Sequence, residues 1–324
     1  MSSAADSSSH LRLTATLSAL ATVGAGAAMA LQGSANGALG GILGSGVLAA
    51  TCSFLTGLVI LAVVVVSLPS ARAGVARAWR LVRTGEVPWW MTLGGIAGCT
   101  VVLAQAFTVP LIGVAVFTMA YIAGQLVGAL VVDNTELPPG ARKRPTVGRL
   151  LGSAIVLAGV SLSAVHVLGQ GVPLWAPVLP FVAGALTAAQ QATNGRLKMM
   201  SRSAVAATFT NFLVGSVVLV IASAVTFLAG AGIAGLPELP GDWWVLIGGA
   251  CGVIFIGVTT QTVAHLGVLL LSLMSLFGNL LGSLVIDLTF HTAKAAIGPM
   301  TFASMAVVLA GVVVTSLRPR PTRY

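Results

Sequence analysis

The fold is decided by a stretch of sequence that occurs twice. It reads GAAMALQGSANGAL at residues 26–39 and GALTAAQQATNGRL at residues 184–197, which is an offset of 158 residues. The same offset places the amide residues of the two stretches opposite each other: Gln32 with Gln190, and Asn36 with Asn194. The pattern indicates that one structural unit is used twice in the chain.

A second offset, of 154 residues, continues the repeat towards the end of the chain. It aligns GQLVGALVVD at residues 124–133 with GNLLGSLVID at residues 278–287. It also aligns the tryptophan pair at residues 89–90 with the pair at residues 243–244. Unrelated sequences do not keep register over this length, so we predict two copies of the same unit, one after the other.

The composition of the chain is that of a membrane protein. Hydrophobic residues make up 57% of its 324 residues and charged residues only 7%, whereas a soluble domain has about 25% charged residues. So few charges cannot cover a surface that faces water, which excludes a soluble enzyme. The apolar content also excludes an intrinsically disordered chain. The length suits about ten membrane helices of ~20 residues joined by short loops.

Apolar runs separated by polar and turn-forming segments place the predicted spans. We expect an all-α polytopic protein with ten transmembrane helices, at residues 13–36, 45–67, 88–108, 111–132, 147–167, 176–197, 204–229, 243–263, 267–288 and 298–317. The helices form two repeats of five, and the chain is then divided into a disordered tail at residues 1–12, a first repeat at 13–168, a second repeat at 174–317 and a basic tail at 318–324.

The basic residues predict which side of the membrane the loops occupy. If the N-terminus is cytoplasmic, 15 of the 16 Lys and Arg residues fall in cytoplasmic segments and only Lys294 lies outside. Positive charge collects in cytoplasmic loops, so we predict that both termini lie in the cytoplasm. These loops would face anionic lipid headgroups, which accounts for the net charge of +9 without nucleic acid as a partner. A cleaved signal peptide would also fit the first apolar run, but the internal copy of that run disfavours it.

The odd number of helices in each repeat inverts the second repeat in the membrane. Five spans bring the chain to the opposite side, so a pseudo-twofold axis in the membrane plane relates the two repeats. Inverted repeats are the recurrent architecture of secondary transporters, whose binding sites lie at the repeat interface near the middle of the bilayer. Two repeats that can exchange conformations give inward-open and outward-open states of similar energy. We therefore predict a carrier that works by alternating access.

Amide side chains inside the spans are the candidate substrate-binding residues. A polar group in hydrocarbon is costly unless it faces protein or water. Gln and Asn four residues apart lie on one helix face, and this spacing occurs in both copies. We predict that six amides line a central cavity: Gln32, Asn36, Gln190, Asn194, Gln125 and Asn279. Two structural alternatives stay open, namely hydrogen bonds between helices and, for the asparagines that precede glycine, capping of helix C-termini.

Acidic residues are almost absent from the predicted spans. Asp133 and Asp287 lie at the ends of the fourth and ninth helices and are the candidates for coupling transport to protons or ions. No catalytic motif, phosphate-binding loop or metal-ligand spacing occurs, so we expect no enzymatic activity, no metal and no cofactor. The three cysteines lie in apolar runs, where cysteine packs as a small hydrophobic residue.

In these motifs the chain resembles a known group of proteins. The pattern Gln-x-x-x-Asn-Gly-x-Leu, which begins at Gln32 and again at Gln190, is similar to the drug/metabolite transporter superfamily, YdcZ-like branch, in a fused two-repeat form. The resemblance covers nearly all of the chain beyond residue 13. It implies a carrier of the cytoplasmic membrane that moves a small metabolite, a drug-like solute or an organic cation, often by export.

One departure from the superfamily bears on the substrate. Its small multidrug exporters carry a glutamate in the first helix that binds the cation and the coupling protons, and Gln32 and Gln190 occupy that place here. A glutamine cannot exchange a proton, so we expect a neutral or zwitterionic solute bound by amide hydrogen bonds. Coupling stays open between facilitated diffusion, protons at Asp133 or Asp287, and another ion.

Two other classes of function stay open at the level of sequence. A non-transporting membrane scaffold or assembly subunit would bury its amides in contacts between helices, whereas a carrier needs a wet pocket near the membrane midplane. A membrane enzyme would need a reactive cluster at one membrane face, and the sequence has none. Because both repeats are fused, one chain can be complete, as a monomer or in a homodimer.

Overall fold

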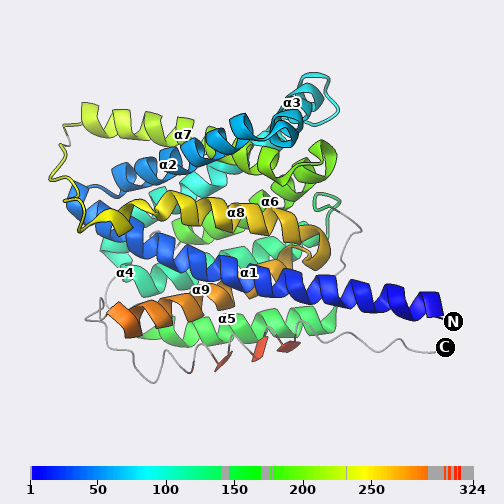
Figure 1. Cartoon of the computed structure of the whole chain (residues 1–324). Helices are drawn as coiled ribbons and strands as arrows, with labels where there is room; N and C mark the ends of the chain where they lie inside the picture. The colour runs from blue at the N-terminus through cyan, green and yellow to red at the C-terminus, as the bar shows by residue number, and fades with distance from the viewer. Residues whose placement is uncertain are drawn as a thin grey trace.

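The structure is a computed structural model that describes residues 2–139, 146–168, 176, 178–230, 232–290 and a few positions between 303 and 314. Side chains are described from Thr14 onwards, with further gaps at 105–107, 109–119, 159–168, 283–284 and 286–290. All the regular structure in this part of the chain is helical (Figure 1). The helices are α1 (Ser2–Leu43), α2 (Gly46–Ser67), α3 (Pro69–Arg83), α4 (Gly94–Asp133), α5 (Val147–Leu168), α6 (Val178–Ser201), α7 (Ala204–Leu228), α8 (Gly248–Leu266) and α9 (Val268–Phe290), with 3-10 turns η1 (Trp89–Leu93) and η2 (Trp243–Leu246).

The apolar helices follow the predicted spans. Among the described residues, four helical stretches are long and apolar enough to cross a membrane, namely Thr14–Leu43, Gly46–Ser67, Ala204–Leu228 and Trp243–Leu266. Shorter apolar stretches occupy four further predicted spans: Trp89–Ala104, Ala120–Asp133, Val147–Ala158 and Val268–Gly282. α6 occupies the sixth predicted span. The last predicted span, at residues 298–317, lies outside the described residues except at a few positions.

Two segments are more helical than the sequence predicts. α1 begins at Ser2, so it extends into the tail that we expected to be disordered, because a helix propagates easily once its first turn has formed. α3 fills a segment between the second and third predicted spans that we expected to be a loop. The buried residues of α3 recur three or four positions apart, at Ala71, Gly74, Ala78 and Leu81, which is the spacing of an amphipathic helix.

The first part of α4 runs antiparallel to α6. A Cβ added at Gly94 would lie 2.7 Å from Oδ1 of Asn194, and one added at Gly98 would lie 3.5 Å from Nε2 of Gln190. Residue numbers therefore rise along α4 while they fall along α6. α8 meets α1 in the same way, since α8 is the repeat partner of this part of α4.

The last part of α4 runs parallel to α6. Gly124 lies against the backbone of Phe181, and Gly128 against the backbone of Ala185. A straight helix of 40 residues would be about 60 Å long and could not contact α6 in both directions. The chain therefore reverses within residues 105–119, without a non-helical residue. The sequence predicted two spans here, and the two ends of α4 occupy them.

The packing of the glycines follows the pseudo-twofold symmetry that the repeat predicts. A Cβ added at Gly57 would lie 2.3 Å from Cε1 of Phe212, and a Cβ at its repeat partner Gly215 would lie 2.3 Å from Cε1 of Phe54. The same correspondence holds for two further contacts, Gly26 with the carbonyl of Ser275 and Gly184 with the carbonyl of Tyr121. The two repeats therefore make equivalent contacts in three dimensions.

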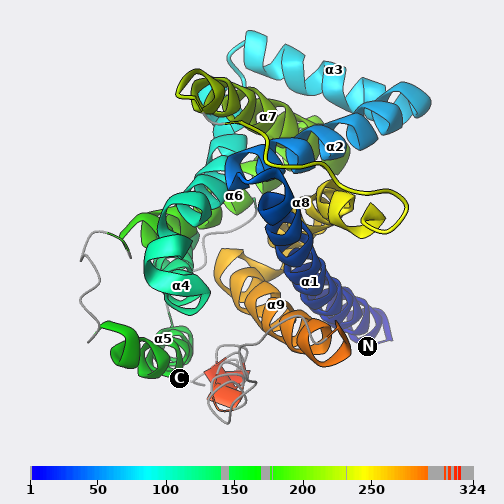
Figure 2. The ribbon, with the colours of Figure 1, turned by 90° about the vertical axis from the view of Figure 1, so that its left-hand side faces the viewer.

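The helices form two groups, each of which combines both repeats (Figure 2). In the first, the α4–α6 group, α4 of the first repeat packs along α6 of the second. In the second, the α1–α8–α9 group, α1 of the first repeat packs along α8 and α9 of the second. α2 and α7 pack against each other and lie along one side of both groups. Both repeats therefore contribute to each side of the surface between these two groups.

The arginine-rich helix ends gather at one end of the molecule, which we call the basic end (right in Figure 1). It comprises α3, the α6–α7 junction, the start of α5 and the α8–α9 junction. Arg77 of α3 donates a hydrogen bond to the carbonyl of Ser201 at 3.3 Å, and Arg196 donates to the carbonyl of Glu136. α6 packs against α8 there, whereas α1 and α4 share no equivalent packing among the described residues. The two groups are joined at the basic end and apart at the other.

Candidate functional site

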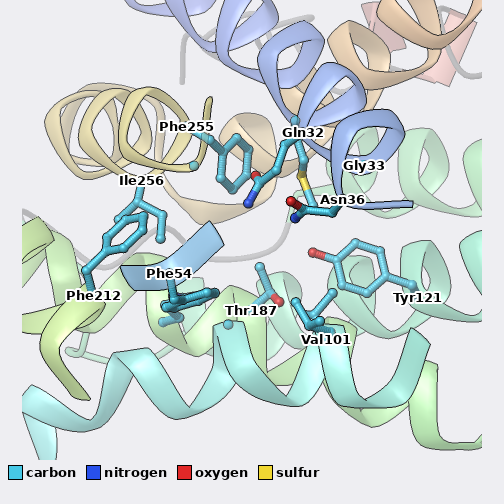
Figure 3. Close-up of a pocket in the computed structure, with 15 residues that line it drawn as sticks. Gln32, Gly33, Asn36, Phe54, Val101, Tyr121, Thr187, Phe212, Phe255 and Ile256 are labelled. Atoms are coloured by element: carbon cyan, nitrogen blue, oxygen red, sulfur yellow. The ribbon is translucent and has the colours of Figure 1, made fainter. Parts of the chain in front are cut away.

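A cavity lies between the two helix groups where they separate (Figure 3). It holds about 660 Å³ of empty space, counting the part that opens to solvent. The α4–α6 group contributes Val101, Tyr121, Thr187 and Gln190; the α1–α8–α9 group contributes Met29, Gln32, Asn36, Phe255 and Ile256; and α2 and α7 contribute Phe54 and Phe212. Both repeats therefore supply the walls of one cavity, as the predicted central site requires.

The cavity extends towards the end opposite the basic end. Towards that end it is lined on α1 by Gln32, Gly33 and Asn36. Of the repeat partners of these residues on α6, only Gln190 lines it, because Gln191 and Asn194 are packed away with 3% and 4% of their surfaces exposed. Positions that are equivalent in the repeat thus have different environments at the two ends of the molecule.

The two glutamines at the centre rest on glycines of the neighbouring helix. A Cβ at Gly252 would lie 3.0 Å from Nε2 of Gln32, and a Cβ at Gly98 would lie 3.5 Å from Nε2 of Gln190. The missing Cβ atoms leave room for the amides. Gln190 is 7% exposed, and its Nε2 has no hydrogen-bond partner among the described residues. A buried donor without a partner costs about 1–3 kcal/mol, so this group can receive a hydrogen-bond acceptor from a ligand or a water.

The two asparagines differ although the repeat makes them equivalent. Oδ1 of Asn194 accepts a hydrogen bond from Nδ2 of Asn211 at 3.4 Å, and Asn194 does not line the cavity. Asn36 lines the cavity, and its Oδ1 is buried without a partner within the described part of the chain. The repeat partner of Asn211 is Ser53, whose side chain is too short to reach in the same way. Asn36 therefore offers a free acceptor, whereas Asn194 joins two helices.

The third pair of predicted amides lies away from this cavity. Gln125 is 1% exposed and packs where α4 meets α6, beside Gly184. Its repeat partner Asn279 is half-buried and packs in the equivalent place on α9, beside Gly26. Neither lines the cavity, because the close helix contacts made by the glycines turn this face of each helix towards its neighbour. Gln125 and Asn279 lie in the helix interfaces that hold each group together.

Aromatic and hydroxyl groups in the cavity were not predicted from the sequence. Phe54 and Phe212 are repeat partners and contact each other, with ring centroids 5.1 Å apart. Tyr121 is hydrogen-bonded to Thr187 on the opposite helix of the α4–α6 group. Figure 3 shows the hydroxyl of Tyr121 and the amides of Gln32 and Asn36 pointing into the same space. The alignment of the two repeats contained the signal for Phe54 and Phe212, whereas nothing in the repeat singles out Tyr121.

The two walls differ in polarity. Tyr121 and Thr187 on the α4–α6 side correspond in the repeat to Ser275 and Met29 on the other side. The pair Val101 and Val102 corresponds to Phe255 and Ile256. The α4–α6 wall therefore carries two hydroxyl groups and two valines, whereas the other wall carries two amides and larger apolar side chains. No Asp, Glu, Lys, Arg or His is among the described residues that line the cavity.

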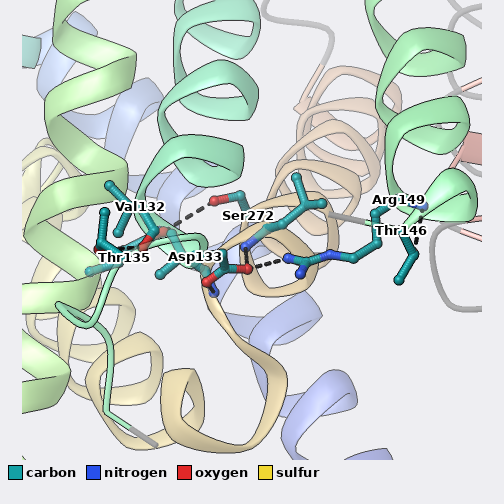
Figure 4. Close-up of polar contacts among 9 residues, drawn as sticks. Val132, Asp133, Thr135, Thr146, Arg149 and Ser272 are labelled. Carbon is teal, nitrogen blue, oxygen red and sulfur yellow. Dashed lines mark hydrogen bonds and ion pairs between the residues drawn. The ribbon is translucent and has the colours of Figure 1, made fainter. Parts of the chain in front are cut away.

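Asp133, a predicted coupling residue, lies at the basic end and not in the cavity (Figure 4). Its carboxylate is 1% exposed and forms an ion pair with Arg149 of α5. It also accepts hydrogen bonds from the backbone N–H groups of Val268 at 2.7 Å and Leu269 at 3.1 Å, at the start of α9. The side chain of Asp287 lies outside the described residues. Where side chains are described, no group of three or more His, Cys, Asp or Glu could hold a metal ion.

Comparisons with known proteins place this architecture. A family model with the description "Putative inner membrane exporter, YdcZ" matches the chain twice, over residues 17–162 and 175–314. No curated protein matches the chain. A solved structure, described only as "Crystal structure of protein", matches with a TM-score of 0.62 and 17% sequence identity, and the match covers 93% of this chain and 96% of that one. At this identity the likeness shows the fold alone.

Proposed function

Since the chain belongs to the YdcZ family of the drug/metabolite transporter superfamily, in a fused two-repeat form, we propose that it is a secondary carrier that works by alternating access. The family is one of inner-membrane exporters, so the chain is a multi-pass protein of the cell membrane and its class of function is transport. A family of exporters is not a family of enzymes. The direction that we propose, export, follows from the family.

The observation that carries the proposal is the unequal environment of two pairs of repeat-related positions on α1 and α6. Gly33 and Asn36 line a cavity, whereas their repeat partners on α6, Gln191 and Asn194, are buried between packed helices. The two repeats therefore share one sequence pattern but differ in conformation within one molecule: the helix surface is open in one repeat and closed in the other. The opposite state is reached when the two repeats exchange these forms, which is the physical basis of alternating access in inverted repeats.

The distribution of arginines supports an assignment of the state. We place the basic end in the cytoplasm, because positive charge collects in cytoplasmic loops. The helix groups meet at this end and are apart at the other, so the conformation is closed to the cytoplasm and open towards the outside. In an export cycle, this is the state from which solute leaves.

The cavity supports an uncharged or zwitterionic solute with an apolar body. Nε2 of Gln190 offers a donor and Oδ1 of Asn36 offers an acceptor, and neither has a partner within the described residues. The faces of Phe54, Phe212 and Phe255 provide apolar contact. A lone cation would find no carboxylate among the described residues that line the cavity, and bringing it into a low-dielectric site would be costly. A scaffold is less consistent with this arrangement, because it would pair its amides between helices.

Counterflow in liposomes tests the proposal without knowledge of the coupling ion. The purified chain is reconstituted in liposomes. The liposomes are loaded with pools of unlabelled solutes and assayed for uptake of labelled members of each pool. We expect uptake with at least one neutral or zwitterionic pool, and its loss in Gln32→Ala and Gln190→Ala. Absence of counterflow for every pool in folded, inserted protein would contradict the carrier.

Gln261→Ala provides the matched control. Gln261 is an exposed amide of α8 that does not line the cavity, so we expect its variant to transport as the parent does. Uptake that survives both cavity substitutions would keep the carrier and exclude Gln32 and Gln190 as binding residues. Equal loss in all three variants would indicate a general effect on folding.

A further inference from the structure

The basic end is held closed by a side chain of one helix group and backbone N–H donors of the other. Asp133 ends α4, which belongs to the α4–α6 group, and its carboxylate accepts from Val268 and Leu269, which begin α9 of the α1–α8–α9 group. α9 begins directly after Gly267, whose φ of +77° ends α8. The first N–H groups of a helix have no partner within the helix, so the carboxylate bonds the two groups together at this point.

Two further contacts strengthen the same junction. Arg149 of α5 forms an ion pair with Asp133, so the buried carboxylate has a counter-charge. Ser272 of α9 donates a hydrogen bond to Oε1 of Gln191 on α6 at 3.1 Å, and Ser272 is fully buried. An anion at a helix N-terminus is favourable, and breaking a buried ion pair leaves an uncompensated charge. The helix groups cannot separate at the basic end until Asp133 releases α9.

The repeat supplies part of a second copy of this arrangement. The offset of 154 residues pairs Asp133 with Asp287, and Val268 and Leu269 with Val114 and Ala115, which lie in the segment where α4 reverses. The same offset pairs Arg149 with Ala303. Because Val114 and Ala115 lie inside the continuous helix α4, an equivalent contact at the other end would have the carboxylate but no arginine, and it would need α4 to open at these residues and free their N–H groups.

We propose that Asp133 is the latch that keeps the basic end closed, and that Asp287 forms the corresponding and weaker latch at the other end when the carrier changes state. This proposal rests on the proposed function. Asp133 is then a positioning residue that never contacts the solute. The arginine present on one side only biases the molecule towards the state in which the basic end is closed, which is the state of this structure.

Cysteine labelling in nanodiscs tests the latch without any substrate. In a variant lacking the three native cysteines, Ser272→Cys reports on the closed end. Gly33→Cys reports on the open cavity, and an added Cβ there meets nothing within 4 Å. With Asp133→Asn, we expect a membrane-impermeant maleimide to label Ser272→Cys roughly tenfold faster or more, because a hydrogen bond to a charged group is worth about that factor. Labelling of Gly33→Cys should become slower, because the other end closes.

Reciprocal changes separate a latch from simple loosening. A substitution that merely loosens the fold would raise both labelling rates, and this outcome would overturn the proposal, as would unchanged rates. Asp242→Asn is the matched control: Asp242 also accepts a backbone N–H, that of Glu238 at 2.9 Å, but within one loop. We expect this variant to label as the parent does at both positions.

Two further variants decide the question if Asp133→Asn does not fold. Arg149→Gln removes the ion pair but leaves the Asp133 carboxylate bonded to the start of α9. It should therefore raise the labelling rate of Ser272→Cys, but by less than Asp133→Asn does. Asp287→Asn should slow that labelling, and faster labelling would contradict the mirrored latch. Reciprocal labelling together with failed counterflow for every solute would overturn the carrier and keep the latch. Counterflow together with unchanged labelling rates would keep the carrier and overturn the latch.

Discussion

Phe54 and Phe212 contact each other with ring centroids 5.1 Å apart and ring planes inclined at 38°. They are repeat partners, separated by the offset of 158 residues. Two symmetry-related side chains can touch only where the symmetry axis passes between them. The contact therefore marks the pseudo-twofold axis, and it does so in the wall of the cavity.

The position of this pair on the axis makes a prediction about symmetry. Phe54→Leu and Phe212→Leu should destabilise the protein by similar amounts, because each ring packs against the other and against an equivalent glycine. The double variant should show a coupling energy of about 0.5–1.5 kcal/mol, the usual value for an aromatic pair. Unfolding by SDS in mixed micelles measures all three free energies. Strongly unequal single effects, or no coupling, would contradict the symmetric contact.

Gln190→Leu should separate stability from transport. The substitution removes a buried donor that has no partner among the described residues, so we expect the free energy of unfolding to stay the same or to increase by about 1 kcal/mol. Counterflow should be lost, because the solute no longer finds its donor. The two measurements use the same purified sample. A destabilised variant with normal counterflow would show that Gln190 is a structural residue.

The glycines beneath the central glutamines should control the size of the cavity. In Gly98→Ala, the added Cβ would lie 3.1 Å from Cζ of Phe54, and in Gly252→Ala it would lie 3.2 Å from Cζ of Phe212. These neighbours are side-chain ends that can move by a few tenths of an ångström into the cavity. We expect unfolding free energies within about 1 kcal/mol of the parent and weaker uptake of the larger members of a transported pool. Unchanged size preference in counterflow competition would contradict this.

The glycines of α4 and α9 that contact a neighbouring backbone should be essential for folding. A Cβ at Gly124 would lie 1.8 Å from the carbonyl oxygen of Phe181, and one at Gly278 would lie 1.9 Å from that of Val23. Backbone cannot move aside, so Gly124→Ala and Gly278→Ala should each destabilise the protein by about 1–3 kcal/mol or more.

Gly24→Ala is the control for this pair, because an added Cβ there meets nothing within 4 Å. In a helix it should be neutral or stabilise by about 0.5–1 kcal/mol. Size-exclusion chromatography after heating compares the three variants. If Gly24→Ala were as unstable as Gly124→Ala, loss of glycine itself and not the backbone clash would be the cause.

The outer face of α3 predicts an interaction with anionic lipid. Trp79 is 51% exposed, and Arg80 and Arg83 are exposed beside it. An interfacial helix attracts anionic headgroups by about 1 kcal/mol for each basic residue near the surface. Phosphatidylglycerol should therefore raise the melting temperature of the parent more than that of Arg80→Gln/Arg83→Gln. Phosphatidylcholine should affect both alike, and equal responses to the two lipids would exclude the interaction.

The symmetric part of the fold could be predicted because the sequence repeat shows which positions of the two repeats are equivalent. The alignment of Gly57 with Gly215 and of Gly26 with Gly184 predicted equivalent positions, and the structure places them in equivalent contacts. α3 could also have been predicted, since its buried residues follow a helical spacing. The two ends of α4 were predicted as two spans because the sequence has two apolar runs there, at residues 88–108 and 111–132.

The asymmetric part of the site could not be predicted, because a repeat describes both conformations at once. The sequence predicts the same role for Gln32 and Gln190, and both line the cavity. It also predicts the same role for Asn36 and Asn194, but only Asn36 lines the cavity. Which partner is open depends on how the helix groups are tilted. The contact of Asp133 with the start of α9 joins residues 135 positions apart, and no local pattern announces it.

The pairing of α1 with α8 and α9 has a consequence for biosynthesis. α1 leaves the ribosome well before α8 and α9, the helices along which it packs. During translation the first repeat must wait in the lipid with its glycine surfaces uncovered, and it cannot mature as a separate unit. We expect a chain truncated after α5 to be a substrate for membrane proteases, and a split at the junction of the repeats to be rescued only when both fragments are inserted together.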